Sequence, residues 1–184
     1  AAVTLLEPNN RLGKKLLITG KGRCNVTNDC PWEDVLKNTP TNPRFLYSAL
    51  SRFTPADTKA FFEHQGCALK TERGNRVFPV SDHAADILAA LERHLCGTGV
   101  RLEHARVTAV AAANGSVCGI RAADRFYPAD AVILATGGCS YPLTGSTGDG
   151  YRMAAALGHT IVEPVGSLVP LVERGHDCAA MQGL

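Results

Sequence analysis

The stretch AVILATGGCSYPLTGSTGDGY, residues 131–151, decides how this chain is expected to fold. Residues 131–135 form a short, continuous apolar run, which is typical of a strand buried on both faces. The run ends in Thr136-Gly137-Gly138, where side chains become small and a ligand can approach the backbone. An ordinary turn between a strand and a helix is the alternative interpretation.

The same stretch leads into an expected helix. Ser146 and Thr147 are both favourable N-cap residues for a helical pattern over 151–157, and Gly158 closes that pattern. Free N–H groups at a helix start favour negative charge. The sequence therefore predicts an α/β protein with an anionic ligand near this turn.

A second glycine-rich stretch, GKKLLITGKGRCNVTN, covers residues 13–28. Gly20 and Gly22 allow positive φ on either side of Lys21. Several residues of the stretch offer charge for phosphate oxygens or hydrogen bonds for a polar ring, namely Lys14, Lys15, Lys21, Arg23, Asn25, Thr27 and Asn28. The apolar residues 16–18 are expected to anchor this loop to a core. The alternative is a solvated basic turn.

Composition indicates one globular domain. The chain has 184 residues, 45% hydrophobic and 20% charged, with a net charge of +2. Its basic residues are dispersed except around 11–23, so no nucleic-acid partner is expected, and no apolar run is long enough for a membrane helix. Seven cysteines without a C-x-x-C pair favour reduced thiols and a cytoplasmic location over a disulfide framework or a zinc ribbon.

Helices and strands alternate through the rest of the chain. Thr54-Pro55-Ala56-Asp57 predicts a helix start, and Gly66 is expected to end that helix. A second helix is expected over 81–95. Short strands are predicted at about 100–104, 106–113, 117–122 and 125–127. Asn114-Gly115 between two of them is a hairpin signal, so these strands are expected to form an antiparallel meander.

Other segments give no site. Residues 29–53 contain an expected short helix after Asn42-Pro43 and an apolar cluster around Phe45, and are explained as a packed connection. Several histidines and cysteines lack a repeated ligand spacing, namely His64, Cys67, His83, His94 and Cys96. No metal site is therefore predicted. The patterns of hydrolase nucleophile elbows and phosphate-binding loops are also missing from the sequence.

Four motifs together resemble the BaiN-like (YhiN-like) FAD-dependent oxidoreductases. They are the 13–28 stretch, GNRVFPVSDHAADIL at 74–88, ILATGGCSYPLTGSTGDGYRMAAALGH at 133–159 and PVGSLVPL at 164–171. The resemblance covers essentially the whole chain. It implies a glutathione-reductase-like, Rossmann-type FAD-binding domain with an inserted antiparallel β-meander.

The resemblance also implies that this domain is incomplete at both ends. The family begins with a strand and a G-x-G-x-x-G turn that seats the FAD pyrophosphate, and no G-x-G-x-x-G occurs here. Residues 1–7 resemble the second strand of that unit, with Glu7 as the ribose-binding acid. After residues 181–184 the family continues into an inserted domain and a segment that completes the flavin site. We therefore expect residues 1–184 to be a partial FAD-binding domain.

The resemblance implies a set of cofactor-binding positions. They are Glu7, Lys14, Thr19, Gly20, Gly22, Arg23, Cys24, Asn25, Val107, Thr136, Gly137, Gly138, Gly148 and Asp149. Val107 is expected to present its backbone to the adenine. Arg76 is either a substrate-facing arginine or a salt-bridged one, and His159 is a further candidate. Catalytic residues cannot be assigned from the sequence.

Cys24 has a chemistry of its own to consider. Its position beside Arg23 in a basic loop is expected to lower the thiol pKa. A redox dithiol with Cys30 is the less favoured alternative, because a spacing of six residues is unusual for such a pair. We expect Cys24 to pack beside the flavin ring.

The function that the resemblance implies is hydride transfer from NAD(P)H through FAD to an organic acceptor. In some relatives the acceptor is a conjugated alkene of a steroid-like acid, and others are labelled amine oxidases. Two alternatives remain open. One is a flavin-binding or tRNA-modifying flavoprotein, and the other is an inert partial domain that holds no cofactor. The sequence does not indicate an oligomeric state.

Overall fold

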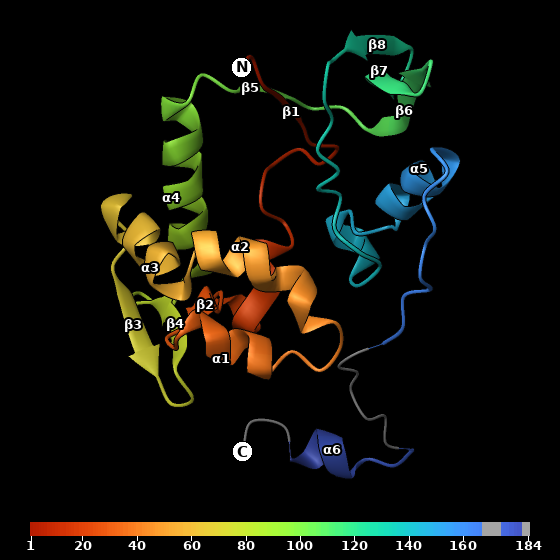
Figure 1. Ribbon diagram of the computed structural model, residues 1–184. Helices are drawn as coiled ribbons and strands as arrows, with labels where there is room; N and C mark the ends of the chain where they lie inside the picture. The colour runs from red at the N-terminus through yellow and green to blue at the C-terminus, as the bar shows by residue number, and fades with distance from the viewer. Residues whose placement is uncertain (167–173, 182–184) are drawn as a thin grey trace.

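The computed structural model describes residues 1–166 and 174–181. Residues 167–171 of the motif at 164–171, and residues 182–184, lie outside the described part. Two groups of elements are joined by a parallel strand pair, β1 (Thr4–Leu6) and β5 (Arg101–Glu103). Figure 1 shows helices α1–α4 with a small sheet on one side of this pair and a β-meander with α5 on the other.

The first group packs four helices around a three-stranded antiparallel sheet. The helices are α1 (Trp32–Lys37), α2 (Tyr47–Arg52), α3 (Pro55–His64) and α4 (Ala84–Gly97), with 3-10 turns η1 (Leu16–Gly22) and η2 (Pro43–Leu46). The sheet has the order β2 (Thr27–Asn28), β4 (Arg76–Pro79), β3 (Leu69–Glu72). Because α4 places Ala84, Ile87 and Ala90 at helical spacing, one face of it is fully buried.

The core of this group explains the apolar run at 16–18. Leu16 and Leu17 pack against a buried cluster that contains Cys24, Phe62 and Ile87, whereas Ile18 is exposed. The run therefore anchors the following loop, as predicted. Gly20 adopts a φ of +55°, and a Cβ there would lie 2.9 Å from the backbone nitrogen of Asn25, so this position requires glycine.

The second group is a β-meander followed by helix α5 (Asp149–Ala156). The strands are β6 (Val107–Ala113), β7 (Ser116–Ala122) and β8 (Arg125–Pro128), in the order β6-β7-β8. Asn114 and Gly115 both have positive φ, as a primed hairpin turn requires. The turn η3 (Pro142–Thr144) precedes α5, and α6 (Asp177–Ala180) lies near the chain end. The mixture of a parallel strand pair, antiparallel sheets and helices confirms the α/β class.

Three local predictions are wrong. The strand expected at 100–104 pairs in parallel with β1 and is not part of the meander. Residues 131–135 form no strand, and the side chain of Ile133 is 91% exposed, because no described strand lies beside this segment to pair with it. The N-cap of α5 is Gly148, which has a φ of 75° and makes no side-chain cap, so neither Ser146 nor Thr147 caps the helix.

An ion-pair cluster fixes the loop after η1 to the β3–β4 hairpin. The guanidinium of Arg23 lies 2.5 Å from Glu72 and 2.7 Å from Asp82, and Lys70 lies 2.6 Å from Asp82. Arg23 also stacks on the Phe78 ring at 4.0 Å. Hydrogen bonding to Arg23 lowers the pKa of Glu72, and hydrogen bonding to Lys70 and Arg23 lowers the pKa of Asp82. The cluster therefore holds both carboxyls ionised.

We predict that Thr54→Ala destabilises the protein by about 1 kcal/mol, the usual cost of losing an N-cap side chain. Thr54 accepts a hydrogen bond from the Asp57 backbone at 3.1 Å, and the Asp57 carboxylate accepts one from the Thr54 backbone at 2.8 Å. Urea unfolding measures the loss. The control is Ser51→Ala at the exposed end of α2, which should leave the free energy of unfolding nearly unchanged. Equal effects would contradict the capping assignment.

We also predict that acid removes the stabilisation given by the ion-pair cluster of Arg23, Lys70, Glu72 and Asp82. The folded-state pKa values of Glu72 and Asp82 are lowered, so their contribution is complete at neutral pH and is lost as the pH falls through those values. Urea unfolding of wild type and Glu72→Gln/Asp82→Asn should differ at about pH 7 and converge as the pH falls below the lowered folded-state pKa values of the two carboxyls. A difference that does not depend on pH would contradict this origin. The charge control is Glu63→Gln, which changes an exposed side chain of α3.

Candidate functional site

A cavity of about 250 Å³ lies where the segment after β1 meets the start of β6, the 135–137 segment and α5. It is lined by Glu7, Pro8, Asn9, Gly13, Lys14, Lys15, Arg106, Val107, Ala135, Thr136, Gly137, Thr144, Gly145, Ser146, Asp149 and Met153. These residues come from segments that are distant in the sequence, and the β1–β5 pair brings the first of them to the meander. We refer to this as the Glu7 cavity.

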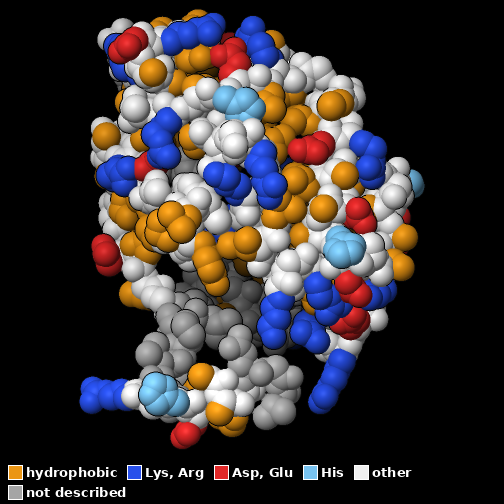
Figure 2. Space-filling model, turned by 180° about the vertical axis from the view of Figure 1, so that it is seen from behind, with side chains coloured by type: hydrophobic (Ala, Val, Ile, Leu, Met, Phe, Trp, Pro, Cys, Tyr) orange, Lys and Arg blue, Asp and Glu red, His pale blue; other side chains and the backbone are white. Residues whose placement is uncertain are grey.

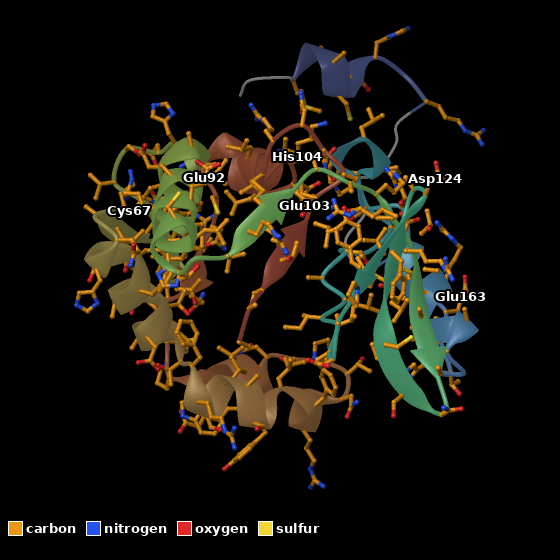
Figure 3. The ribbon with its side chains drawn as sticks, turned by 90° about the horizontal axis from the view of Figure 1, so that it is seen from above. Cys67, Glu92, Glu103, His104, Asp124 and Glu163 are labelled. Atoms are coloured by element: carbon orange, nitrogen blue, oxygen red, sulfur yellow. The ribbon has the colours of Figure 1, made fainter. Side chains whose placement is uncertain are left out.

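Glu7 is held in place by its own turn. Its Oε1 accepts hydrogen bonds from the backbone and the side-chain amide of Asn9, at 2.8 and 2.7 Å. The same amide donates to the Thr144 carbonyl at 3.1 Å, and Nδ1 of His104 donates to the Asn9 carbonyl at 2.6 Å. Figure 3 shows His104 beside Glu103 at the end of β5, next to the N-terminal segment. Among the residues that the structure describes, the hydrogen bonds to the Glu7 side chain use Oε1 alone, so Oε2 can accept hydrogen bonds from a ligand.

The two lysines of the cavity differ in their partners. Lys15 donates to the carbonyl and hydroxyl oxygens of Ser140, at 2.6 and 3.0 Å, and lies 5.2 Å from the Tyr141 ring. Lys15 therefore holds the 139–141 loop against the segment between β1 and η1. Lys14 lines the cavity without an ion pair to any residue that the structure describes, so its ammonium group is available to an anion.

Asp149 lies between two arginines at the edge of the cavity. Arg106 donates to Oδ2 of Asp149 at 2.8 Å, and Arg152 pairs with Oδ1. Burial alone would raise the pKa of Asp149, but the hydrogen bond with Thr147 and the charges of Arg152 and Arg106 outweigh it and lower that pKa. Asp149 thus ties α5 to the start of β6 and is ionised at neutral pH.

A second cavity of about 280 Å³ opens between β6 and α5. It shares Arg106, Val107, Asp149 and Met153 with the Glu7 cavity. The ion pairs of Asp149 therefore lie on the boundary between the two spaces. Because β6 is the edge strand of its sheet in the described residues, one row of its backbone groups is available at this boundary.

Six of the fourteen predicted cofactor positions line the Glu7 cavity. They are Glu7, Lys14, Val107, Thr136, Gly137 and Asp149. Gly138 and Gly148 lie beside it and join by a backbone hydrogen bond of 3.1 Å. Thr19, Gly20, Gly22, Arg23, Cys24 and Asn25 line neither cavity. The structure thus gathers the positions around residues 7, 107 and 136 and leaves the 19–25 loop elsewhere.

The loop at 19–25 bears on two expectations. The Arg23 side chain is directed to Glu72 and Asp82, and its expected contact with a phosphate stays a prediction. Burial raises the pKa of the Cys24 thiol, so the prediction of a lowered pKa is wrong. Cys24 lies in the core cluster with Cys67, which is labelled in Figure 3. The charge of Arg23 is paired with Glu72 and Asp82. Thr19 donates to the Leu16 carbonyl at 2.6 Å and so closes its own turn.

Two further candidates are not in the cavity. Arg76 donates to the Arg73 carbonyl at 3.1 Å and lies 5.7 Å from the Phe78 ring, without a salt bridge to any described residue. His159 is exposed just after α5. Within residues 1–166 and 174–181, no three side chains of the metal-ligating types come together, and no helix has the length and apolar character to cross a bilayer.

Sequence reasoning did not find three important residues of the cavity. Asn9 orients Glu7, Arg106 binds Asp149, and Ser146 lies against Gly137. Asn9 follows Pro8, and Arg106 lies in the connection between β5 and β6. Neither residue belongs to a recognisable sequence motif. Arg106 had one weak signal, because it directly precedes Val107.

Comparison with known proteins gives the family. The HI0933-like protein Rossmann domain matches residues 1–175. The chain is 38% identical over 190 positions to 3-dehydro-bile acid delta(4,6)-reductase of Clostridium scindens, a match that covers 100% of this chain and 44% of that protein. It is 28% identical over 186 positions to ribosomal RNA dihydrouridine synthase of Haemophilus influenzae, which covers 96% of this chain and 44% of that protein.

A second ribosomal RNA dihydrouridine synthase, from Escherichia coli, is 28% identical over 178 positions, covering 91% of this chain and 41% of that protein. The chain thus spans less than half the length of each of these relatives. The family match extends over nearly all of it and confirms the resemblance carried by the glycine-rich motifs. The chain belongs to the HI0933-like family and carries its Rossmann domain.

Proposed function

We propose that this chain holds the adenosine side of FAD in the Glu7 cavity, as part of a flavin-dependent oxidoreductase. The observation that carries the proposal is the convergence of Glu7, Lys14, Val107 and Thr136-Gly137 on one cavity. These positions were selected as cofactor positions from sequence motifs far apart in the chain. A nucleotide can be bound by a carboxylate at its ribose, an ammonium group at its phosphate, backbone groups of a strand at its adenine, and a glycine turn that lets it approach the backbone.

The size of the cavity limits what it can hold. Complete small-molecule sites have about 300–1,000 Å³. The Glu7 cavity, at about 250 Å³, suits a nucleoside with one phosphate rather than the whole dinucleotide. The residues present therefore fit part of FAD. The flavin ring would lie outside this cavity, which agrees with a chain that spans less than half of its relatives.

Each side chain has a role in this arrangement. Glu7 offers Oε2 to the hydroxyls of a ribose, since Asn9 already occupies Oε1. Lys14 offers an ammonium group to a phosphate. Gly137 has a φ of +72°, and a Cβ there would lie 3.0 Å from Oγ of Ser146, so a side chain at 137 would crowd the cavity wall.

The chemistry that FAD supplies when bound is hydride transfer, here proposed to run from NAD(P)H to an organic acceptor. The names of the relatives suggest one class of acceptor. A delta(4,6)-reductase of a 3-dehydro-bile acid and a dihydrouridine synthase both imply saturation of a C=C bond conjugated with a carbonyl. We propose the same bond type as the substrate here, in a small molecule such as a steroid-like acid. A cytoplasmic location is part of this proposal.

A second candidate acceptor is a uracil base in RNA. It is favoured by the two ribosomal RNA dihydrouridine synthases among the relatives and by a group of exposed aromatic and arginine side chains on η2, α2 and the residue after α2, described below. The chemistry at the flavin is the same for both acceptors. They differ in whether the protein must also bind a polynucleotide.

We predict weak but specific FAD binding by this chain, seen as quenching of flavin fluorescence on titration. Glu7→Gln should weaken binding about tenfold or more, because hydrogen bonds to a charged group contribute about 1.5–3 kcal/mol. Lys14→Ala should weaken it similarly and make the remaining affinity less sensitive to salt.

The matched controls remove the same charges, one negative and one positive, at positions outside the cavity. Glu163→Gln and Lys37→Ala change exposed side chains outside the cavity and should leave the affinity unchanged. Equal losses in the cavity and control variants would contradict the proposed site. A complete lack of quenching, with the fold intact by circular dichroism, would favour the inert partial domain.

A further inference from the structure

The helical group contains a long stretch without acidic residues. From Val35 to Ala56 the sequence has no Asp or Glu, although the chain contains 17 of them. The stretch includes η2 and α2, to which the sequence analysis assigned no site. A surface formed by it therefore carries no negative side chain of its own.

Three aromatic side chains of this stretch are exposed. Phe45 is 81% exposed, Tyr47 56% and Phe53 53%. Tyr47 is supported by an edge-to-face contact with Trp32 of α1, at 5.2 Å between ring centroids. Ser48, Ala49 and Ser51 between them are small and exposed, so little side-chain bulk separates the rings.

Two arginines accompany these rings. Arg44 and Arg52 are exposed, and neither forms an ion pair in the part of the chain that the structure describes. Arg101 and Arg125, by contrast, both lie close to Glu103. Arg76 and Arg121 are exposed and, like Arg44 and Arg52, form no ion pair among the described residues. We define the aromatic face as Arg44, Phe45, Tyr47, Arg52 and Phe53.

The aromatic face differs from the rest of the surface. Figure 1 shows α1 and α2 at the front of the molecule, and Figure 3 shows them at its outer edge, away from the meander. Figure 2 shows the opposite face, where Lys and Arg side chains occur with Asp and Glu among them. The five residues of the aromatic face include two arginines and no acid, which the net charge of +2 for the whole chain does not reveal.

We infer that the aromatic face binds a single-stranded segment of RNA. Unpaired bases stack on exposed aromatic rings, and guanidinium groups bind the phosphates between them. A duplex would fit poorly, because its bases are already stacked and the two arginines reach few phosphates. A second copy of the chain would bring Arg44 and Arg52 to a two-fold interface from both sides, and this stretch has no acidic residue to pair with them.

This inference rests on the second acceptor class of the proposed function, but its test does not use the flavin. We would measure fluorescence anisotropy of a labelled twelve-nucleotide oligouridine RNA with the whole chain, at several salt concentrations. The same oligonucleotide as DNA, and as an RNA duplex with oligoadenosine, are the comparison probes. FAD quenching by each variant is measured in parallel.

The expected result is salt-dependent binding of the single strand, with the duplex at least tenfold weaker. Phe45→Ala/Phe53→Ala should weaken single-strand binding about tenfold or more, since each stacked base contributes about 1–3 kcal/mol. Arg44→Gln/Arg52→Gln should lower the slope of log affinity against log salt by about 1.4, at about 0.7 for each phosphate contact. FAD quenching should stay unchanged in both variants.

The matched control is Arg121→Gln/Phe126→Ala on the meander. These residues also form an exposed arginine–aromatic pair, at 5.7 Å, but on another part of the surface. Circular dichroism and a thermal melt confirm that each variant is folded. RNA binding that is equally weak in control and test variants, equal binding of duplex and single strand, or no binding at all would overturn the inference. Self-association abolished by the Phe45 and Phe53 changes would also overturn it, in favour of a second copy.

Discussion

The site depends on the pairing of β1 with β5. Only three residues of each strand take part, with Leu5 opposite Leu102, and the ladder continues as the Glu7 backbone donates to Glu103 at 3.1 Å. This pairing places the first segment of the chain beside the loop that leads into β6. Glu103 in turn accepts a hydrogen bond from Tyr127 at 2.7 Å, which ties β8 to the same point and raises the pKa of that tyrosine. Without the parallel pair, Glu7 and Val107 would not share a cavity.

Asp149 gives the cavity its second boundary. One carboxylate binds two arginines, so the group as a whole keeps one positive charge beside the Glu7 carboxylate. A nucleotide has a neutral base and anionic phosphates. The cavity is lined both by Val107, beside which a base can lie, and by Lys14 and Arg106, which carry positive charge. Asp149 therefore acts less through contact with a ligand than by fixing where α5 and β6 lie. An acid in the first turn of a helix is favourable for the same electrostatic reason that an anion is.

Local sequence rules predicted the elements whose signals are local. The Thr54 helix start and the Asn114-Gly115 hairpin were confirmed because capping and turn geometry depend on neighbouring residues alone. The strand at 131–135 was wrong because a strand needs a partner, and no described segment provides one. Likewise, the charge beside Cys24 was visible in the sequence, but the direction of the Arg23 side chain was not, and that direction and burial decide the thiol pKa. Family motifs marked Glu7 and Gly137, whereas Asn9 and Arg106 required the fold.

Total charge is a poor guide to the partners of this chain. A sum near zero is consistent with evenly mixed charges, and also with an acid-free stretch balanced by acids elsewhere. The structure shows the second situation, because Glu72, Asp82, Glu103 and Asp149 each neutralise basic residues and Arg44 and Arg52 are left without such partners among the described residues. Net charge therefore does not describe the surface around α2, where RNA binding is proposed. The proposed saturation of a conjugated double bond needs the same groups around FAD for a steroid-like acid and for a uracil base in RNA. Under this proposal the two substrates are distinguished by surfaces outside the cofactor cavity, and α2 lies on such a surface.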